Sequence, residues 1–227
     1  MTVTPDQVSA VLVTRGNVDM GPIVDSLIFD DIVIWDNSVE PQDQMTFGRC
    51  LAIERAKHDI IYSQDDDLIH SPENQLRLLE QYEPGVLVGC MWDEWSAGAA
   101  AQGIPHGYDD LVFAGSGAIY DRDIPPAAVD RYLECFPLDD FFRLWADTII
   151  GIIAPTRQVD IRFEVLPSAS DDYRMCNQSG AVQNKKDAIQ RARAVRDLVA
   201  KDRPTRDAHE MYLAGIAAGS KPEHRYL

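Results

Sequence analysis

Three adjacent aspartates follow a short apolar run in the first third of the chain. Asp65, Asp66 and Asp67 come soon after Ile60-Ile61-Tyr62, which has the composition of a buried strand. Adjacent carboxylates repel one another at neutral pH, and Mg²⁺ or Mn²⁺ removes that cost because a hard cation prefers oxygen ligands. If the strand geometry persists, Asp65 and Asp67 point to one side and Asp66 to the other. The triplet therefore predicts a divalent metal site, although it is also compatible with an acidic turn before a helix.

Polar residues also follow two earlier predicted strands. The strand at 7–13 ends in Thr14-Arg15-Gly16-Asn17, and the strand at 31–35 ends in Asp36-Asn37-Ser38. With strands at 60–62 and 86–91 and helices at 21–27, 46–58 and 71–82, strand and helix alternate three times in about ninety residues. That order predicts a mostly parallel α/β sheet with helices on both faces. Because ligands bind beyond the carboxyl ends of such strands, Thr14, Arg15 and Asp36 should share one crevice with the aspartates.

The second half of the chain is less regular. We expect a loop at 92–108, a strand at 111–120 broken by Gly115-Ser116-Gly117, and a half-buried strand at 158–165 with Val159, Ile161, Phe163 and Val165 inward. Helices are expected at 125–135, 139–150, 186–200 and 206–218. No linker of domain-separating length occurs, so we expect one domain over 1–227: a ligand-binding half at 1–91, a second half at 92–185, and C-terminal helices from 186.

The net charge of −16 argues against a broad surface for binding nucleic-acid phosphates. Residues 185–206 are an exception, with eight Lys or Arg against three Asp. This basic segment is either a solvated helix face or a cationic wall beside an anionic ligand. Neither a membrane-spanning run nor a signal peptide is visible, and Cys50 and Cys90 have the surroundings of buried free thiols, so we expect a cytoplasmic protein without structural zinc.

The order VLVTRGN, IVIWDNS and GRCLAIERAKHDIIYSQDDDLI resembles the nucleotide-binding half of the GT-A glycosyltransferases. The resemblance implies a GT-A (Rossmann-like) fold with a small acceptor-side β region. It implies that Thr14 and Arg15 border the nucleotide, that Asp36 contacts the base and that Arg49 lies near the diphosphate. The triplet matches the DxD motif, whose implied role is to bind Mn²⁺ or Mg²⁺ through Asp65 and Asp67, with Asp66 also at the donor.

The resemblance extends into the second half. LVFAGSGAIYDRDI is similar to the segment that the family places beside the donor sugar, so Gly115 and Gly117 would let the backbone approach the sugar; a β-bulge is the alternative. FPLDDFFRLWADTIIG resembles the acidic helix near the acceptor, which implies Asp147 as the catalytic base. Asp139 and Asp140 are alternative candidates for the catalytic base, and both are equally consistent with capping the helix. The chain has Ala146 where the family usually has a second acid, and His209 and His224 are its only C-terminal candidates for a further metal ligand.

The function implied is metal-dependent transfer of a hexosyl group from a nucleoside-diphosphate sugar, with a UDP-sugar favoured, to an acceptor hydroxyl. The acceptor is a small molecule, a glycan, a protein or, as a minority option that fits the basic segment, a hydroxymethylpyrimidine in DNA. The pair Trp92 and Trp95 could stack on a sugar or base, or anchor a loop. Two alternatives remain: a sugar-phosphate nucleotidylyltransferase, and a non-catalytic module that binds nucleotide sugars.

Overall fold

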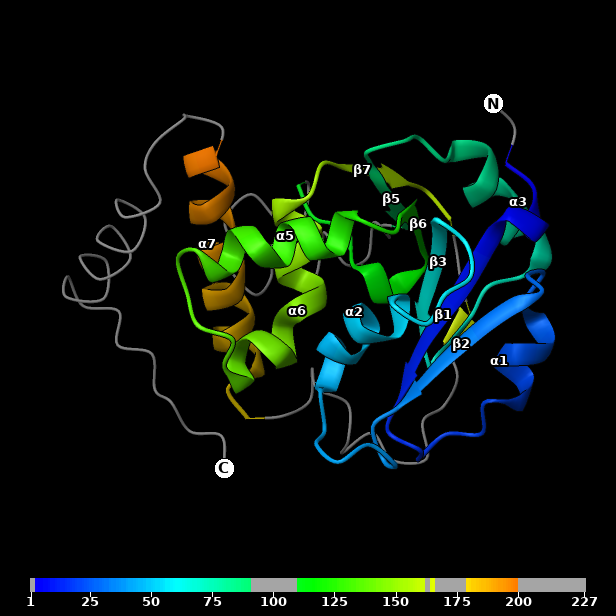
Figure 1. Cartoon of the computed structure of the whole chain (residues 1–227), viewed down its shortest axis with the longest axis horizontal. Coiled ribbons are helices and arrows are strands. Elements are labelled where there is room, and N and C mark those ends of the chain that lie inside the picture. Colours follow the sequence, from blue (N-terminus) through cyan, green and yellow to red (C-terminus); the bar gives the residue numbers. More distant parts are fainter. Residues whose placement is uncertain (1–2, 91–109, 162–163, 166–178, 200–227) are drawn as a thin grey trace.

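The computed structural model describes residues 3–90, 110–161, 164–165 and 179–199. A six-stranded sheet with the order β2-β1-β3-β6-β5-β7 forms its centre (Figure 1). The strands are β1 (Val8–Thr14), β2 (Asp31–Asp36), β3 (Ile60–Asp65), β5 (Leu87–Cys90), β6 (Ala118–Asp121) and β7 (Thr156–Val159). β4 (Leu68–Ile69) pairs separately with β8 (Glu164–Val165). The mixed α/β sheet, flanked by helices, is the architecture that the GT-A resemblance implies.

The first three strands are parallel neighbours, and β6 is the one strand of the large sheet that runs the other way. β1 pairs in parallel with β2 and β3, β5 pairs in parallel with β7, and β6 is antiparallel to both β3 and β5. β1 is buried along nearly its whole length, which explains its continuous apolar sequence. Because β6 is reversed, its amino end reaches the same edge of the sheet as the carboxyl ends of β1, β2 and β3.

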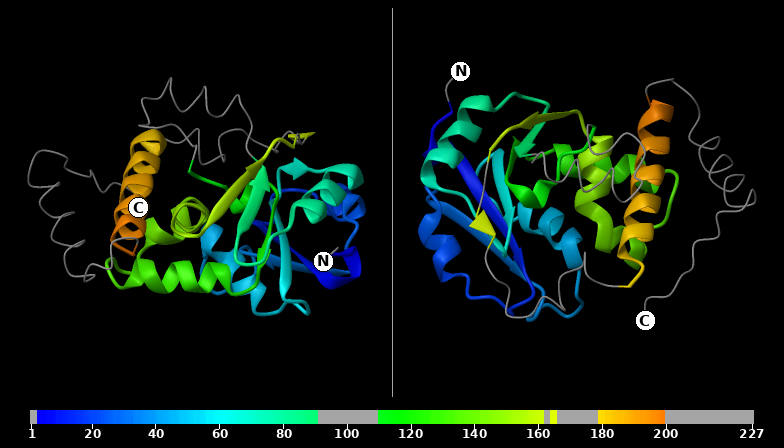
Figure 2. Two further views of the ribbon diagram at one scale, coloured as in Figure 1. Left: turned by 90° about the horizontal axis from the view of Figure 1, so that it is seen from above. Right: turned by 180° about the vertical axis from the view of Figure 1, so that it is seen from behind.

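Helices cover both faces of this sheet (Figure 2). One face packs against α2 (Gly48–Ile53), α5 (Ile124–Leu133) and α6 (Asp140–Ile153), and α7 (Ala181–Val199) packs outside α6. On the other side lie α1 (Gly21–Ser26) and α3 (Pro72–Gln81). Ser71 caps α3 by accepting from the Asn74 N–H, and Pro72 occupies the first helical position, as the sequence predicted. Three 3₁₀ turns complete the elements, at η1 (Pro5–Gln7), η2 (Met45–Phe47) and η3 (Ala114–Ser116).

Two predicted strands differ from the structure. The strand predicted at 111–120 is broken at 115–117, as expected, but only its second part forms: η3 occupies Ala114–Ser116, Gly117 takes φ +93°, and β6 begins at Ala118. The strand predicted at 158–165 is two strands in different sheets: β7 ends at Val159 in the large sheet, and β8 pairs with β4. Ile161, between them, is buried as expected, whereas Phe163 lies outside the described residues.

The helices predicted within the described residues are present, with altered ends. The helix expected at 46–58 is η2 followed by α2, so its regular part is six residues long. Asp139 caps α6 by accepting from the Phe142 N–H, and Asp140 pairs with Arg143, which supports the capping interpretation of these two acids. Several predictions concern residues outside the described ranges: the helix at 206–218, the loop at 92–108, and Trp92, Trp95, His209 and His224. In the part of the chain that is described, no helix combines the length and apolarity needed to cross a membrane.

Candidate functional site

The carboxyl ends of β1, β2 and β3 bring the predicted donor-side residues to one edge of the sheet. Thr14 is the register partner of Asp36 on β2, and Val13 is the register partner of Asp65 on β3. Neighbouring strands lie about 4.8 Å apart, so Thr14 stands between Asp36 on one side and the aspartate triplet on the other. The residues predicted to share one crevice therefore lie at the ends of three adjacent parallel strands.

The turn after β2 is held in a fixed shape against the turn after β1. Asp36 Oδ1 accepts from the Ser38 N–H at 2.9 Å and from the Ser38 hydroxyl at 2.6 Å. Gly16 has φ +73°, and a residue with a side chain would not fit at this position because its Cβ atom would overlap Ser38. Thr14 Oγ1 in turn accepts from the Gly16 N–H at 3.0 Å. Asp36 is thus oriented by its own turn, with one carboxylate oxygen engaged by Ser38.

The aspartate triplet does not continue the strand, which corrects the expected alternation of its side chains. β3 ends at Asp65, and Asp66 and Asp67 form the turn that leads into β4. Asp66 bends back toward β1, where the Thr14 hydroxyl and the Arg15 N–H bond its carboxylate. Burial raises the pKa of Asp66, and those two hydrogen bonds oppose the rise. Asp66 therefore links the ends of β3 and β1, and Thr14, Arg15 and Asp66 form one hydrogen-bonded group.

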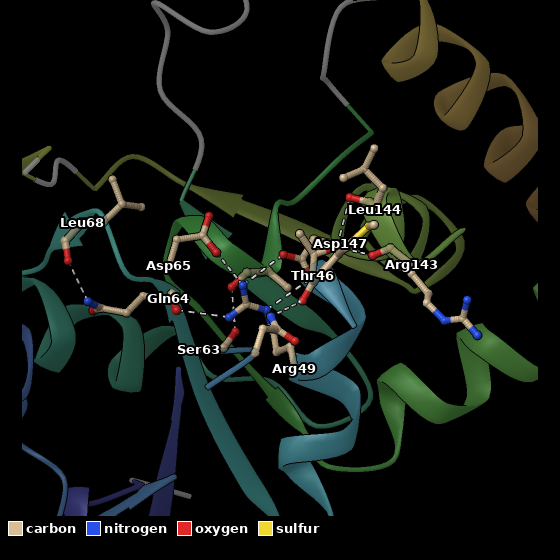
Figure 3. Close-up of polar contacts among 12 residues, drawn as sticks. Thr46, Arg49, Ser63, Gln64, Asp65, Leu68, Arg143, Leu144 and Asp147 are labelled. Carbon is tan, nitrogen blue, oxygen red and sulfur yellow. Dashed lines mark hydrogen bonds and ion pairs between the residues drawn. The ribbon is translucent and has the colours of Figure 1, made fainter. Parts of the chain in front are cut away.

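Arg49 is the buried centre of the site and joins two of the predicted carboxylates (Figure 3). Its guanidinium donates to both oxygens of Asp147, from Nε at 3.1 Å and from Nη2 at 3.0 Å. The same Nη2 donates to Asp65 Oδ1 at 2.5 Å, and Nη1 donates to the Gln64 carbonyl at 3.1 Å. Arg49 comes from α2, Asp65 from the end of β3 and Asp147 from α6. The side chain thus connects the donor side of the predicted site to its acceptor side.

The three side chains of this group differ in their exposure. The side chains of Arg49 and Asp147 are 2% and 11% exposed, whereas that of Asp65 is 43% exposed. Burial alone would lower the pKa of Arg49, but Asp147 and Asp65 outweigh it and raise the pKa. Burial raises the pKa of Asp147, and the Arg49 guanidinium opposes the rise. Arg49 stays charged, and Asp65 is the member of this group that presents a carboxylate to solvent.

Gly115 and Gly117 lie close against other parts of the chain. A Cβ atom on Gly115 would overlap the Asp65 carboxylate, and one on Gly117 would overlap the His70 ring. His70 is fully buried, and its Nε2 lies 3.0 Å from the Ser116 carbonyl. The η3 segment therefore packs directly against Asp65. The contact with a donor sugar that the resemblance implies for these glycines stays a prediction.

Asp65 and Asp67 are the oxygen ligands that the sequence offers to a divalent cation. Both are partly exposed at the end of β3. Within the described ranges, no three His, Cys, Asp or Glu side chains converge as a metal cluster. Two carboxylates on one turn fit a cation of the Mg²⁺ type, which takes one or two protein carboxylates and completes its shell with water and substrate phosphates.

The described part of the basic segment is engaged within the fold. Arg193 and Arg196 of α7 both pair with Asp110 at 2.6 Å, which lowers the pKa of Asp110 to about 2 against the effect of its burial. Lys185 lies 4.5 Å over the Phe113 ring, and Arg191 is buried 4.1 Å over the Phe141 ring. These four cations tie α7 to its neighbours, so intramolecular contacts account for much of the local basic charge.

Two contributors to the site were not predicted from the sequence. Thr46 bonds the backbone of α6 from η2, and His70 packs under Gly117. Thr46 stands three residues before Arg49, a spacing that puts both on one face of a helical turn, and this was the available signal. Cys50 and Cys90 are free thiols, of which Cys90 is buried as predicted and Cys50 is only partly buried.

No known family profile and no curated protein matches this chain. Among solved structures, it is similar to glucosyl-3-phosphoglycerate synthase from Mycobacterium tuberculosis in complex with Mg²⁺ and UDP, with 12% identity and a TM-score of 0.44 over 88% of this chain and 80% of that one. It is also similar to a mannosyltransferase from Pyrobaculum calidifontis in complex with GDP-Man and Mn²⁺, with 13% identity and a TM-score of 0.43 over 97% and 79%. At these identities the similarity concerns the fold, and neither protein assigns an activity to this chain.

Proposed function

We propose that the protein is a metal-dependent glycosyltransferase that takes a sugar from a nucleoside diphosphate and transfers it to an acceptor hydroxyl. The observation that carries the proposal is the edge formed by β1, β2 and β3, where Thr14 pairs in register with Asp36, Val13 pairs with Asp65, and Arg49 links Asp65 to Asp147. The motif order in the sequence supports the same function.

The donor is proposed to lie along this edge. Asp36, whose carboxylate is oriented by Ser38, is proposed to bind the base, and the Thr14–Arg15 turn is proposed to border the nucleotide. Asp65 and Asp67 would hold Mg²⁺ or Mn²⁺, which as a Lewis acid stabilises negative charge on a departing diphosphate. Arg49 holds Asp65 Oδ1, so the guanidinium orients the carboxylate that is to meet the cation.

Asp147 is proposed to accept the proton of the acceptor hydroxyl. A positioned general base typically contributes about 10²–10⁴ in rate. Both of its oxygens accept hydrogen bonds from Arg49, so an acceptor hydroxyl at this position would share the carboxylate with the guanidinium. Arg49 thereby fixes the carboxylate plane on the acceptor side while it holds Asp65 on the donor side.

The test is to incubate the protein with Mn²⁺ and a panel of UDP- and GDP-sugars and to measure release of free nucleoside diphosphate. We expect turnover of one donor, its loss on addition of EDTA, and a loss of at least about tenfold in Asp67→Ala. Asp130→Ala, which removes an exposed carboxylate from α5, is the matched control and keeps wild-type turnover.

The alternatives give different results in the same assay. A nucleotidylyltransferase would release no nucleoside diphosphate, and with added pyrophosphate it would convert the donor to a nucleoside triphosphate and a sugar phosphate. A binding module would retain a donor in the presence of metal without turning it over. Metal-dependent donor binding that survives Asp67→Ala would contradict the assignment of Asp67 to the metal.

A further inference from the structure

Helix α6 is broken at Trp145, two residues before Asp147. Trp145 has φ −111° and ψ 16°, outside helical geometry, so α6 consists of two helical segments joined at this residue. Asp147 therefore lies in the first turn of the second segment. A kink of this kind is found where a side chain inserts into the ladder of main-chain hydrogen bonds.

Thr46, which is remote in sequence, contacts the main chain of α6 just before the kink. The Thr46 hydroxyl lies 3.0 Å from the Arg143 carbonyl and 3.2 Å from the Leu144 carbonyl (Figure 3). In a regular helix these two carbonyls would accept from the N–H groups four residues later, those of Asp147 and Thr148. Thr46 thus supplies a donor to the last carbonyls before the break.

Thr46 and Arg49 attach the η2–α2 segment to α6 on opposite sides of the kink. Thr46 bonds the backbone before Trp145, and Arg49 bonds the Asp147 side chain after it. The two attachments set the position of Asp147 relative to the first segment of α6.

The segment that carries Thr46 is itself held firmly. Met45 has φ +54°, a left-handed conformation that is costly for a residue with a side chain. Asn37 braces it by accepting from the Gln44 N–H at 2.9 Å and donating to the Met45 carbonyl at 3.2 Å. A strained residue with hydrogen bonds on both sides places the Thr46 hydroxyl on α6.

We propose that Thr46 is a positioning residue, which holds the kink of α6 so that Asp147 meets Arg49 with both oxygens. The inference has two parts. The structural part concerns the kink alone, and the catalytic part rests on the proposed function.

The structural part is tested by amide hydrogen exchange of peptides that cover residues 140–150. Thr46→Val keeps the shape of the side chain and removes the hydroxyl, whereas Thr46→Ser keeps the hydroxyl. We expect at least about tenfold faster exchange around the kink in Thr46→Val and wild-type exchange in Thr46→Ser. Thr4→Val, which removes a hydroxyl from the exposed end of η1, is the control. Wild-type exchange in Thr46→Val would overturn the proposal.

The catalytic part is tested with the donor that the turnover assay identifies. We expect Thr46→Val to lower kcat about tenfold with little change in KM for the donor, and Thr46→Ser to restore it. In an Asp147→Asn background, checked for folding by circular dichroism, Thr46→Val should cause no further loss. An equal loss in both backgrounds would overturn the route through Asp147. If the wild-type protein turns over no donor, the proposed function fails, and the exchange experiment still decides the role of Thr46.

Discussion

At the scale of single residues, Arg49 is a cation almost wholly removed from water and surrounded by acceptors. Transfer of a charge into the interior costs several kcal/mol, and this cost is offset only by well-aligned partners. Asp147 supplies two hydrogen bonds, Asp65 one and the Gln64 carbonyl one. Arg49 therefore stabilises the fold only when all of these acceptors are present.

We predict that Arg49→Met destabilises the fold by about 3–5 kcal/mol, because it leaves Asp147 buried without a cation. Arg131→Met, at an exposed position of α5, is the matched control and should change the free energy of unfolding by less than about 1 kcal/mol. Urea denaturation measures both values. The double variant Arg49→Met with Asp147→Leu should be more stable than the sum of its single changes, and strict additivity would contradict the pairing.

Site residues could be predicted from the sequence where they lie at the end of a predicted strand. Thr14 and Asp36 directly follow apolar runs and Asp65 follows one after two polar residues, so their convergence at one sheet edge followed from a parallel sheet alone. The pairing of Arg49 with Asp147 joins residues 98 positions apart. Nothing in local pattern encodes such a contact, since it depends on how α6 docks against α2.

At the scale of elements, η3 packs directly against the carboxylate of Asp65. Gly115 leaves the space that the Asp65 carboxylate occupies, and Ser63 anchors the same segment by donating to the Ala114 carbonyl at 2.6 Å. The distance between η3 and the end of β3 is thus set by the absence of a side chain at position 115.

Gly115→Ala should push Asp65 away from Arg49. We expect a loss of about 1–3 kcal/mol in stability from overpacking and a drop of at least about tenfold in metal-dependent donor turnover. Gly21→Ala, where a Cβ atom would contact only the Asp19 side chain, is the control. Unchanged donor turnover in Gly115→Ala, measured beside thermal unfolding, would show that Asp65 does not need its present position.

The elements that the sequence mispredicted share a cause. Alternating residues at 158–165 were predicted to be one strand, but alternation does not reveal which neighbour a strand pairs with, and β7 and β8 pair in different sheets. The helical pattern of α6 continues through Trp145, so the break there was invisible. In both cases a tertiary partner decided the outcome: β4 for β8, and Thr46 for the kink.

At the scale of the whole molecule, stability should depend on pH through His70. This imidazole is fully buried next to Tyr62, and burial lowers its pKa to about 4 from an ordinary 6.5, although the bond to Ser116 opposes the shift. The unfolded chain binds the proton more tightly, so the fold loses stability as pH falls through 6.5 and the loss levels off below about 4. The shift corresponds to roughly 3 kcal/mol.

The measurement is urea denaturation at a series of pH values between 7 and 4, with His70→Gln compared with wild type. Gln keeps a donor for the Ser116 carbonyl and does not titrate. The wild type should lose up to about 3 kcal/mol more than the variant across this range. Parallel curves for His70→Gln and wild type would exclude a buried neutral histidine.

The reversed strand β6 also has a consequence for how the chain folds as it is made. β6 lies between β3 and β5, and both of those strands precede it in the sequence. Until residues 118–121 have been synthesised, β3 and β5 have no partner on the sides that will face β6. Unpaired strand edges invite association between chains. The middle of the sheet is therefore closed by one of its last strands, and a nascent or truncated chain that stops before Ala118 should be prone to aggregate.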